Sequence, residues 1–285
     1  MANIKIVTDS VSDLPQELLD KWNIDVIPCS VTYGGETYND DGEELDRTDF
    51  YQTIERTKEV PTTAAPPIAL AQEMLENALS GHDHVVSIHV AESLSSTYNN
   101  VLNASKSDGL NGKVTVLDSE TLSMGIGWQV LVAAEVAEQT GDLDTVVRAV
   151  NAAKKNQMLY AAIYTMDFLR RSGRVNNVVA SIGSLLQIKP ILQVFENGDV
   201  QSTHRVRTFK KAKAKLTDLL KEEGELDRLA IIHTQNEAVA QEFLDEHRAL
   251  MPEDVIITEV GPTLGTHIGL KSLGFVSLKK AWRDY

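Results

Sequence analysis

The stretch His84-Val-Val-Ser-Ile-His-Val90, followed by Ala91-Glu-Ser-Leu-Ser-Ser-Thr97, decides the fold class that the sequence predicts. Residues 84–90 are rich in Val and Ile and are typical of a buried strand, and the hydroxyl-rich turn after them opens a helix to about Ser105. Strand-like runs at 4–8 and 113–117 and helix-like runs at 16–22, 68–79 and 123–140 continue this alternation. Apolar strands alternating with helices favour a parallel sheet covered on both faces. We therefore predict an α/β domain at residues 1–156.

Polar residues follow three of these strands. They are Asp9-Ser10, the hydroxyl-rich residues 93–97, and Asp118-Ser119. Ligands of parallel sheets lie beyond the carboxyl ends of the strands. We therefore expect a ligand at this edge of the sheet.

The second half has a different pattern, which predicts a C-terminal α+β domain at residues 157–285. Strand-like runs at 189–195 and 200–207 flank Asn197-Gly198, a strong hairpin signal. Further strands are expected at 159–164, 229–233, 255–260 and 275–282, and helices at 168–173, 209–223 and 237–250, with 178–186 helical or irregular. The mixture indicates an antiparallel element.

Three segments of the first half stand apart from the alternation. Residues 25–33 are strand-like but broken at Pro28, and the acidic stretch 36–46 is expected to be a solvated loop before a short helix at 48–56. Residues 60–67 are expected to be a rigid, extended loop, because residues before proline avoid the helical region. Ser12 or Asp13 is a candidate cap for the helix at 16–22.

Composition excludes several function classes. The chain has 285 residues, a net charge of −14 and one cysteine, Cys29. The charge opposes non-specific binding to nucleic acid. No apolar run approaches the roughly 20 residues of a membrane helix, and the N-terminus has no signal-peptide pattern. With no intramolecular disulfide available, we expect a cytoplasmic protein with no stable membrane insertion. The basic residues between Arg205 and Lys215 are an exception, most simply the solvated face of a helix.

Common catalytic and cofactor motifs are absent. The sequence has no P-loop, no H-E-x-x-H, no C-x-x-C and no G-x-S-x-G elbow, and Gly125-x-Gly127 lacks the third glycine of a dinucleotide site. His82-Asp-His84 is a poor metal candidate without further ligands nearby. We predict no cofactor and no metal.

A glycine-rich connection near the C-terminus carries one histidine. It reads Gly261-Pro-Thr-Leu-Gly265-Thr-His267-Ile-Gly269-Leu-Lys-Ser-Leu-Gly274. Its backbone N–H groups and His267, together with hydroxyls elsewhere in the chain, are suited to a carboxylate. A turn with a satisfied histidine, and serines that only cap helices, would explain the same residues.

Seven motifs in order along nearly the whole chain resemble the DegV family. They are Thr8-Asp9-Ser10-x-x-Asp13-Leu-Pro15, Pro61-Thr-Thr63-Ala-Ala-Pro66, Ser93-x-Ser95-Ser96-Thr97-Tyr98, Asp118-Ser119 with Gly125 and Gly127, Leu169-x-x-Ser172-Gly173-Arg174, Val206-Arg207-Thr208-x-Lys210-Lys211-Ala212, and Gly261-Pro262-x-x-Gly265-Thr266-His267-x-Gly269. The sequence departs from the family pattern at Ala64 and Ala65, which remove polar groups, and at Ser96, which replaces a glycine.

The resemblance implies a bacterial carrier that binds a long-chain fatty acid in an apolar tunnel and serves a fatty acid kinase, without catalysis of its own. Thr63, Ser95 and His267 would hold the carboxylate, and Arg207 and Arg174 would lie near the kinase. Further head-group contacts would come from Ser96, Thr97, Ser119 and Thr266.

Two other hypotheses remain open on the sequence alone. A serine-dependent small-molecule hydrolase would use Ser95 with His267, although the elbow motif is missing. A regulator that binds a sugar or nucleotide would need charged phosphate ligands, which only Arg207 and its neighbours offer.

Overall fold

The computed structural model describes residues 2–57, 59–173 and 188–285. Its first sheet has the order β2-β1-β6-β7, with β1 at Ile4–Asp9, β2 at Asp25–Ile27, β6 at His84–His89 and β7 at Val114–Asp118. Every pairing within it is parallel. The predicted parallel-sheet α/β fold of the first half is confirmed.

Helices cover both faces of this sheet. On one face, α3 (Ile68–Leu79) and α4 (Thr97–Ala104) form an apolar cluster with the strands. On the other face lies α5 (Met124–Thr140), with α6 (Leu143–Lys155) packed beside it. α5 is apolar nearly all round because its far side contacts a second sheet, where Nε1 of Trp128 donates to the carbonyl of Val276 at 3.1 Å.

The second sheet is mixed, which confirms the α+β prediction for the second half. Its order is β10-β9-β8-β13-β11-β12, with β8 at Gln157–Ala162, β9 at Lys189–Val194, β10 at Val200–Val206, β11 at Leu226–His233, β12 at Val255–Glu259 and β13 at Leu273–Lys279. Only β11 and β12 pair in parallel. The predicted hairpin is present, and Asn197 and Gly198 have φ of 60° and 72°.

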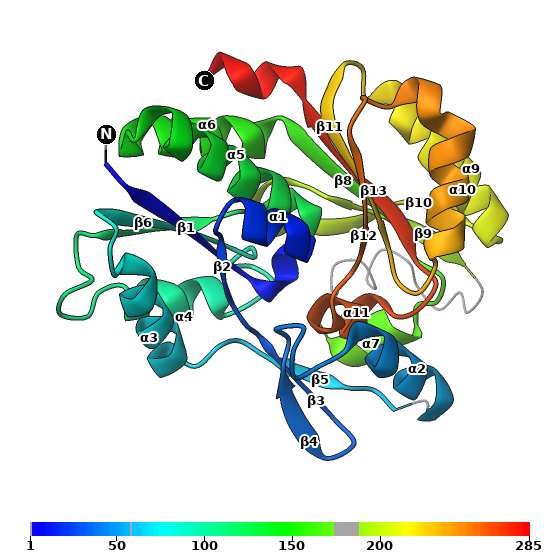
Figure 1. Ribbon diagram of the computed structural model, residues 1–285. Helices are drawn as coiled ribbons and strands as arrows, with labels where there is room; N and C mark the ends of the chain where they lie inside the picture. The colour runs from blue at the N-terminus through cyan, green and yellow to red at the C-terminus, as the bar shows by residue number, and fades with distance from the viewer. Residues whose placement is uncertain (1, 58, 174–187) are drawn as a thin grey trace.

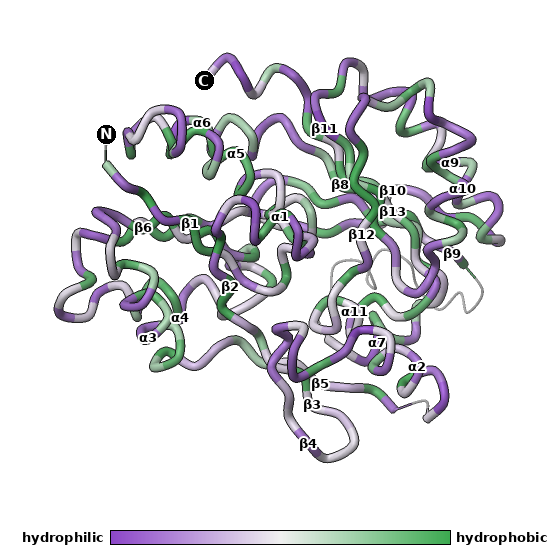
Figure 2. The backbone as a smooth tube through the Cα atoms, in the orientation of Figure 1, coloured by the Kyte–Doolittle hydropathy of each residue, from purple (hydrophilic) through white to green (hydrophobic). Residues whose placement is uncertain are grey.

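Two further helices, α9 (Phe209–Glu222) and α10 (Glu237–His247), cover the outer face of the mixed sheet. The layers therefore run from α3 and α4 through the parallel sheet, α5 and α6, and the mixed sheet to α9 and α10 (Figure 1). Figure 2 shows that β8 and β13 are mostly hydrophobic, whereas α1 (Gln16–Lys21), at the surface, is largely hydrophilic. The domain boundary between residues 156 and 157 stays a prediction, since α5 contacts both sheets.

A third, three-stranded sheet was not predicted. Its order is β4-β3-β5, with β3 at Ser30–Tyr33, β4 at Glu36–Asn39 and β5 at Thr62–Ala64, and α2 (Arg47–Thr57) packs against it. The expectation of a solvated loop at 36–46 is wrong, because β4 pairs with β3 and both Asp40 and Leu45 are buried. The break at Pro28 separates β2 and β3 into different sheets.

The glycine-rich connection is another correction, because it forms the helix α11 (Pro262–Ile268) rather than a turn. Gly265 lets this helix lie against α2, since a Cβ there would be 2.1 Å from the hydroxyl of Tyr51. The cap predicted for α1 is also wrong, because α1 begins after Pro15 without a side-chain cap.

The remaining elements are short. α7 spans Asp167–Ser172, and the 3₁₀ helices η1 to η4 span Ser10–Ser12, Glu196–Gly198, Arg248–Leu250 and Lys280–Asp284. The run predicted at 178–186 lies outside the described residues. Among the helices of the described ranges, none is long and apolar enough to cross a bilayer.

Candidate functional site

An apolar cavity of about 160 Å³ lies where α11, β5 and the turn before α4 meet the mixed sheet. Its apolar wall includes Leu122, Leu159, Ile163, Leu192, Val194 and Ile232. Its polar lining includes Thr63, Ser95, Ser96, Thr263 and His267. Thr63, Ser95 and His267, which the sequence analysis singled out, therefore line one cavity although they lie far apart in the chain.

His267 enters the cavity from the last turn of α11. Leu264, His267 and Ile268 all line the cavity, at the i, i+3 and i+4 spacing that places side chains on one face of a helix. The Nε2 atom of His267 lies 3.1 Å from the hydroxyl oxygen of Thr63. Thr63 is held in turn by β5, where it pairs with Val31 of β3. The pairing of β5 thus fixes the hydroxyl that contacts the imidazole.

Ser95 lies in the turn that opens α4. Its hydroxyl oxygen is 2.8 Å from that of Thr97 and accepts from the Thr97 backbone N–H at 3.2 Å. This contact has the form of a local cap, as the simpler interpretation of the sequence expected. Ser95 also lines the cavity, so capping and ligand contact are compatible in one side chain.

Ser96 also lines the cavity, whereas Thr97, Ser119, Thr266 and Arg207 lie outside its lining. The buried hydroxyl of Thr97 contacts Ser95 and the Cys29 sulfur, that of Ser119 donates to the carbonyl of Thr121 at 3.3 Å, and that of Thr266 donates to the carbonyl of Pro262 at 2.9 Å. Arg207 is exposed just after β10. Arg174 lies outside the described residues.

Several lining residues were missed by the sequence analysis. Val11, Cys29 and Leu264 belong to the lining, as does Thr263. Burial raises the pKa of the Cys29 thiol, so this side chain stays neutral and acts as a small apolar wall residue. The helical spacing of Leu264, His267 and Ile268 was the available signal, together with Pro262 at the first helical position.

The first turn of α11 rests on buried acids. The backbone N–H of Gly261 donates to Oδ1 of Asp13 at 2.8 Å, and that of Thr263 donates to Oδ2 of Asp40 at 3.0 Å. Burial raises the pKa of Asp13 to about 7 and also raises the pKa of Asp40, while the nearby Arg47 guanidinium opposes both shifts. Two carboxyl groups and one guanidinium thus surround the start of the helix that carries His267.

A second array of catalytic residue types is buried in the parallel sheet. The hydroxyl of Ser87 lies 2.6 Å from Nε2 of His89, and Nδ1 of His89 lies 3.0 Å from Oδ2 of Asp9. All three side chains have no exposed surface. Asp9 also accepts from the N–H groups of Val11 and Val90, so the array ties strand ends together. A substrate has no access to this serine.

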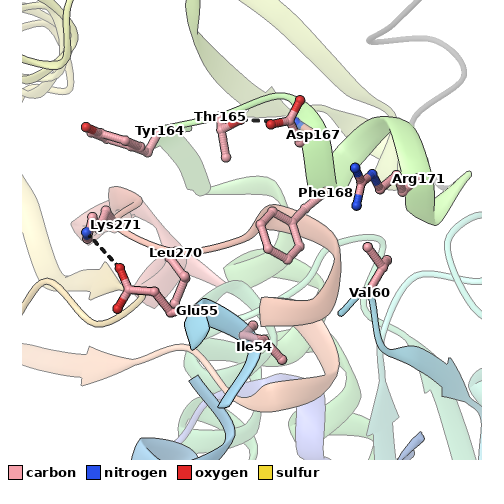
Figure 3. Close-up of a pocket in the computed structure, with 10 residues that line it drawn as sticks. All are labelled: Ile54, Glu55, Val60, Tyr164, Thr165, Asp167, Phe168, Arg171, Leu270 and Lys271. Carbon is pink, nitrogen blue, oxygen red and sulfur yellow. Dashed lines mark hydrogen bonds and ion pairs between the residues drawn. The ribbon is translucent and has the colours of Figure 1, made fainter. Parts of the chain in front are cut away.

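A separate pocket lies between α2, α7 and the segment after α11 (Figure 3). Phe168 lies in the middle of the labelled side chains, and an ion pair of 3.0 Å joins Lys271 to Glu55 at one side. None of the predicted head-group residues lines it. In the part of the chain that the structure describes, no group of three or more His, Cys, Asp or Glu side chains is placed to hold a metal ion.

Comparison with known proteins gives concordant results over nearly the whole chain. The model of the family described as "Uncharacterised protein, DegV family" matches residues 3–280. A DegV domain-containing protein of Listeria monocytogenes is 35% identical over 277 residues, covering 95% of this chain and 96% of the relative. Protein DegV of Bacillus subtilis is 32% identical over 279 residues, covering 95% and 98%.

Solved structures agree with this fold. One solved structure is that of a DegV family protein from Thermus thermophilus, which is described as binding fatty acid. It superposes on this chain with a TM-score of 0.88 at 29% identity, and the superposition covers 97% of this chain and 99% of the other. The crystal structure of DegV from Bacillus subtilis, described as a fatty acid binding protein, has a TM-score of 0.88 at 32% identity and covers 98% and 100%.

Proposed function

The chain belongs to the DegV family, and on that premise we propose that it binds a long-chain fatty acid with its tail in the apolar cavity and its carboxylate at Thr63, Ser95 and His267. The observation that carries the proposal is the joint placement of these three polar side chains in one mostly apolar cavity. The relatives whose structures bind fatty acids support the same ligand class.

The tail supplies most of the binding free energy in this proposal. Each buried methylene contributes about 0.8 kcal/mol, so roughly fifteen of them give a gross driving force near 12 kcal/mol. Immobilisation removes several kcal/mol of this gain and leaves tight binding. A cavity of about 160 Å³ is close in size to one that holds a benzene-sized molecule. A full-length tail therefore also needs the leucine and isoleucine side chains of the wall to change rotamer.

The head-group residues select the carboxylate. A hydroxyl or an imidazole N–H that donates to a carboxylate contributes about 1.5–3 kcal/mol. Nε2 of His267 and the hydroxyl oxygen of Thr63 lie 3.1 Å apart, so one carboxylate can contact both side chains. The hydroxyls of Thr63 and Ser95 are uncharged donors, which suits a carrier that must later release its cargo.

After it has bound the acid, the protein acts as a cytoplasmic carrier that performs no chemistry and presents the acid to a fatty acid kinase, which forms the acyl phosphate. The exposed Arg207 lies near that partner, and Arg174 is assigned to the same role by its motif. A nucleophilic serine needs a base within hydrogen-bond reach. The hydroxyl of Ser95 contacts Thr97, whereas Nε2 of His267 contacts Thr63, and this pairing supports a carrier over a hydrolase.

Ligand extraction and calorimetry test this function. Protein purified without detergent is extracted with organic solvent beside a matched blank, and the extract is analysed by mass spectrometry. We expect one fatty acid per chain. The delipidated protein is then titrated with palmitate and with oleate. Failure of both acids to bind would overturn the carrier proposal.

A further inference from the structure

Asp13 is a buried acid that joins distant segments of the chain. It is not one of the residues proposed to contact the carboxylate of the ligand. Its Oδ1 accepts from the N–H of Gly261 at 2.8 Å, and its Oδ2 accepts from the hydroxyl of Ser123 at 2.5 Å. Its backbone carbonyl accepts from the hydroxyl of Thr258 at 2.9 Å. Only 1% of Asp13 is exposed. One residue therefore links the ends of η1 and β12 with the starts of α5 and α11.

The backbone around this link is held in an uncommon conformation. Asp13 has a φ of 52° and Ser123 a φ of 54°. Residues other than glycine adopt a positive φ only at a free-energy cost, which the surrounding structure must offset. Both residues direct their side chains at one another instead of capping a neighbouring turn, so the contact is maintained against local preference.

We propose that Asp13 is a positioning residue for the head-group site, fixing the first turn of α11 and, through that helix, the imidazole of His267. This role rests on the proposed function, because it concerns how the carboxylate contact is held. His267 lies six positions after Gly261, which corresponds to about 9 Å along the helix. A tilt of roughly 10° at the first turn would therefore move the imidazole by about 1.5 Å, enough to break its contact with Thr63.

The surrounding groups leave α11 little freedom at this end. A Cβ on Gly261 would lie 3.3 Å from Oδ1 of Asp13 and 3.4 Å from Oδ2 of Asp40. Arg47 donates to the carbonyl of Glu259 at 2.7 Å, and Tyr51 donates to that of Val260 at the same distance. Arg47 and Tyr51 of α2 and Asp40, just after β4, are thus the titratable or charged groups that interact with Asp13.

Charge and shape can be separated by two substitutions. Asp13→Asn keeps an oxygen that accepts from Gly261 and an amide that donates to Ser123, whereas Asp13→Ala removes both contacts. Phe243→Leu is the matched control, since Phe243 is a fully buried side chain of the outer α10 layer, remote from α11. Each delipidated variant is titrated by calorimetry with palmitate and with 1-hexadecanol, which has a tail of the same length and no carboxylate.

We expect Asp13→Ala to weaken palmitate binding roughly ten- to hundredfold while hexadecanol binding changes little, because one head-group contact is lost. Asp13→Asn should restore palmitate binding to within a few fold, and Phe243→Leu should leave the ratio of the two affinities unchanged. Equal losses for both ligands in Asp13→Ala would overturn the positioning role while the carrier function stands. If wild type binds neither ligand, the proposed function fails and the positioning role with it.

A second variant covers the case in which Asp13→Ala does not fold. Gly261→Ala retains every charged group but adds a Cβ against Asp13 and Asp40. It should shift the first turn of α11 by a few tenths of an ångström and weaken palmitate binding selectively, by a smaller factor than Asp13→Ala does. An unchanged ratio of palmitate to hexadecanol affinity in this folded variant would also refute the positioning role.

Discussion

Replacing Asp13 by Asn should change how the stability of the protein depends on pH. Burial raises the pKa of Asp13 from its ordinary value of 3.8 to about 7. A carboxyl with a raised pKa binds its proton more tightly in the folded state than in the unfolded state. Its contribution to stability is therefore fully present below pH 3.8 and is lost as the pH rises through about 7. Asn cannot titrate, so the variant lacks this loss.

The size of the effect follows from the two pKa values. The difference between 3.8 and about 7 corresponds to about 4 kcal/mol in total, at about 1.4 kcal/mol for each pH unit. Between pH 5 and 7 the wild type should lose roughly 2–3 kcal/mol relative to Asp13→Asn. Above pH 8 the difference between the two proteins should level off.

Urea denaturation of both proteins across this pH range measures the difference directly. Taking the difference also removes most of the contribution of Asp40 and Glu259, whose pKa values burial raises in the same direction. The same substitution at the exposed Asp108 is the control and should give no comparable trend. A wild type that gains stability relative to Asp13→Asn as the pH rises would refute the reasoning. It would mean that Arg47, Ser123 and the Gly261 N–H outweigh the cost of burial.

Three further outcomes are expected from the contacts of the cavity and of α11. His267→Ala should weaken palmitate binding roughly ten- to hundredfold and leave hexadecanol binding nearly unchanged in calorimetry, and equal losses would exclude the imidazole from the head-group site. Gly265→Ala should lower the free energy of unfolding in urea by about 1–3 kcal/mol, because its Cβ would lie 2.1 Å from the Tyr51 hydroxyl, and an unchanged value would show that α2 yields without cost. A serine-directed phosphonate should leave Ser95 unlabelled by mass spectrometry, and stoichiometric labelling would favour the hydrolase.

Much of the fold could be predicted because the local patterns agree with the tertiary structure. The helix expected at 68–79 is α3 with the same bounds, and the Val- and Ile-rich run at 84–90 is a central strand. The strand β4 could not be found in this way. Its polar residues lie at the edge of a small sheet, and only pairing with β3 shows that they form a strand.

The glycines of α11 show why its helix was not predicted. Glycine disfavours helix because of its backbone entropy, and the stretch contains several. In the folded protein Gly265 and Gly269 face Tyr51 and Phe168 so closely that neither position has room for a Cβ. Glycine is therefore needed at these positions because of tertiary contacts and not because the segment is a flexible turn. No local sequence pattern reveals the aromatic side chains that make these contacts.

Asp13 shows the same limit for a polar residue. By sequence it stands where a cap for α1 is expected, yet its carboxylate accepts from Gly261, 248 positions away. In contrast, Thr63 and His267 could be chosen without the structure, because their motifs follow one another in the order of a family. The resemblance to the family predicted that Thr63 and His267 belong to one site, which their spacing along the chain does not predict.

The two histidine arrays explain why residue types alone would mislead about function. Ser87, His89 and Asp9 have the residue types and distances of a catalytic triad, but all three are fully buried and their contacts stabilise the parallel sheet. At the cavity, Nε2 of His267 contacts the hydroxyl of a threonine. In the proposed complex the carboxylate of the ligand lies beside the imidazole of His267, as the carboxylate of Asp9 lies beside that of His89. The carboxylate of the proposed ligand would thus take the place beside His267 that Asp9 takes beside His89, whereas the hydroxyl that His267 contacts is that of Thr63 and not of a serine.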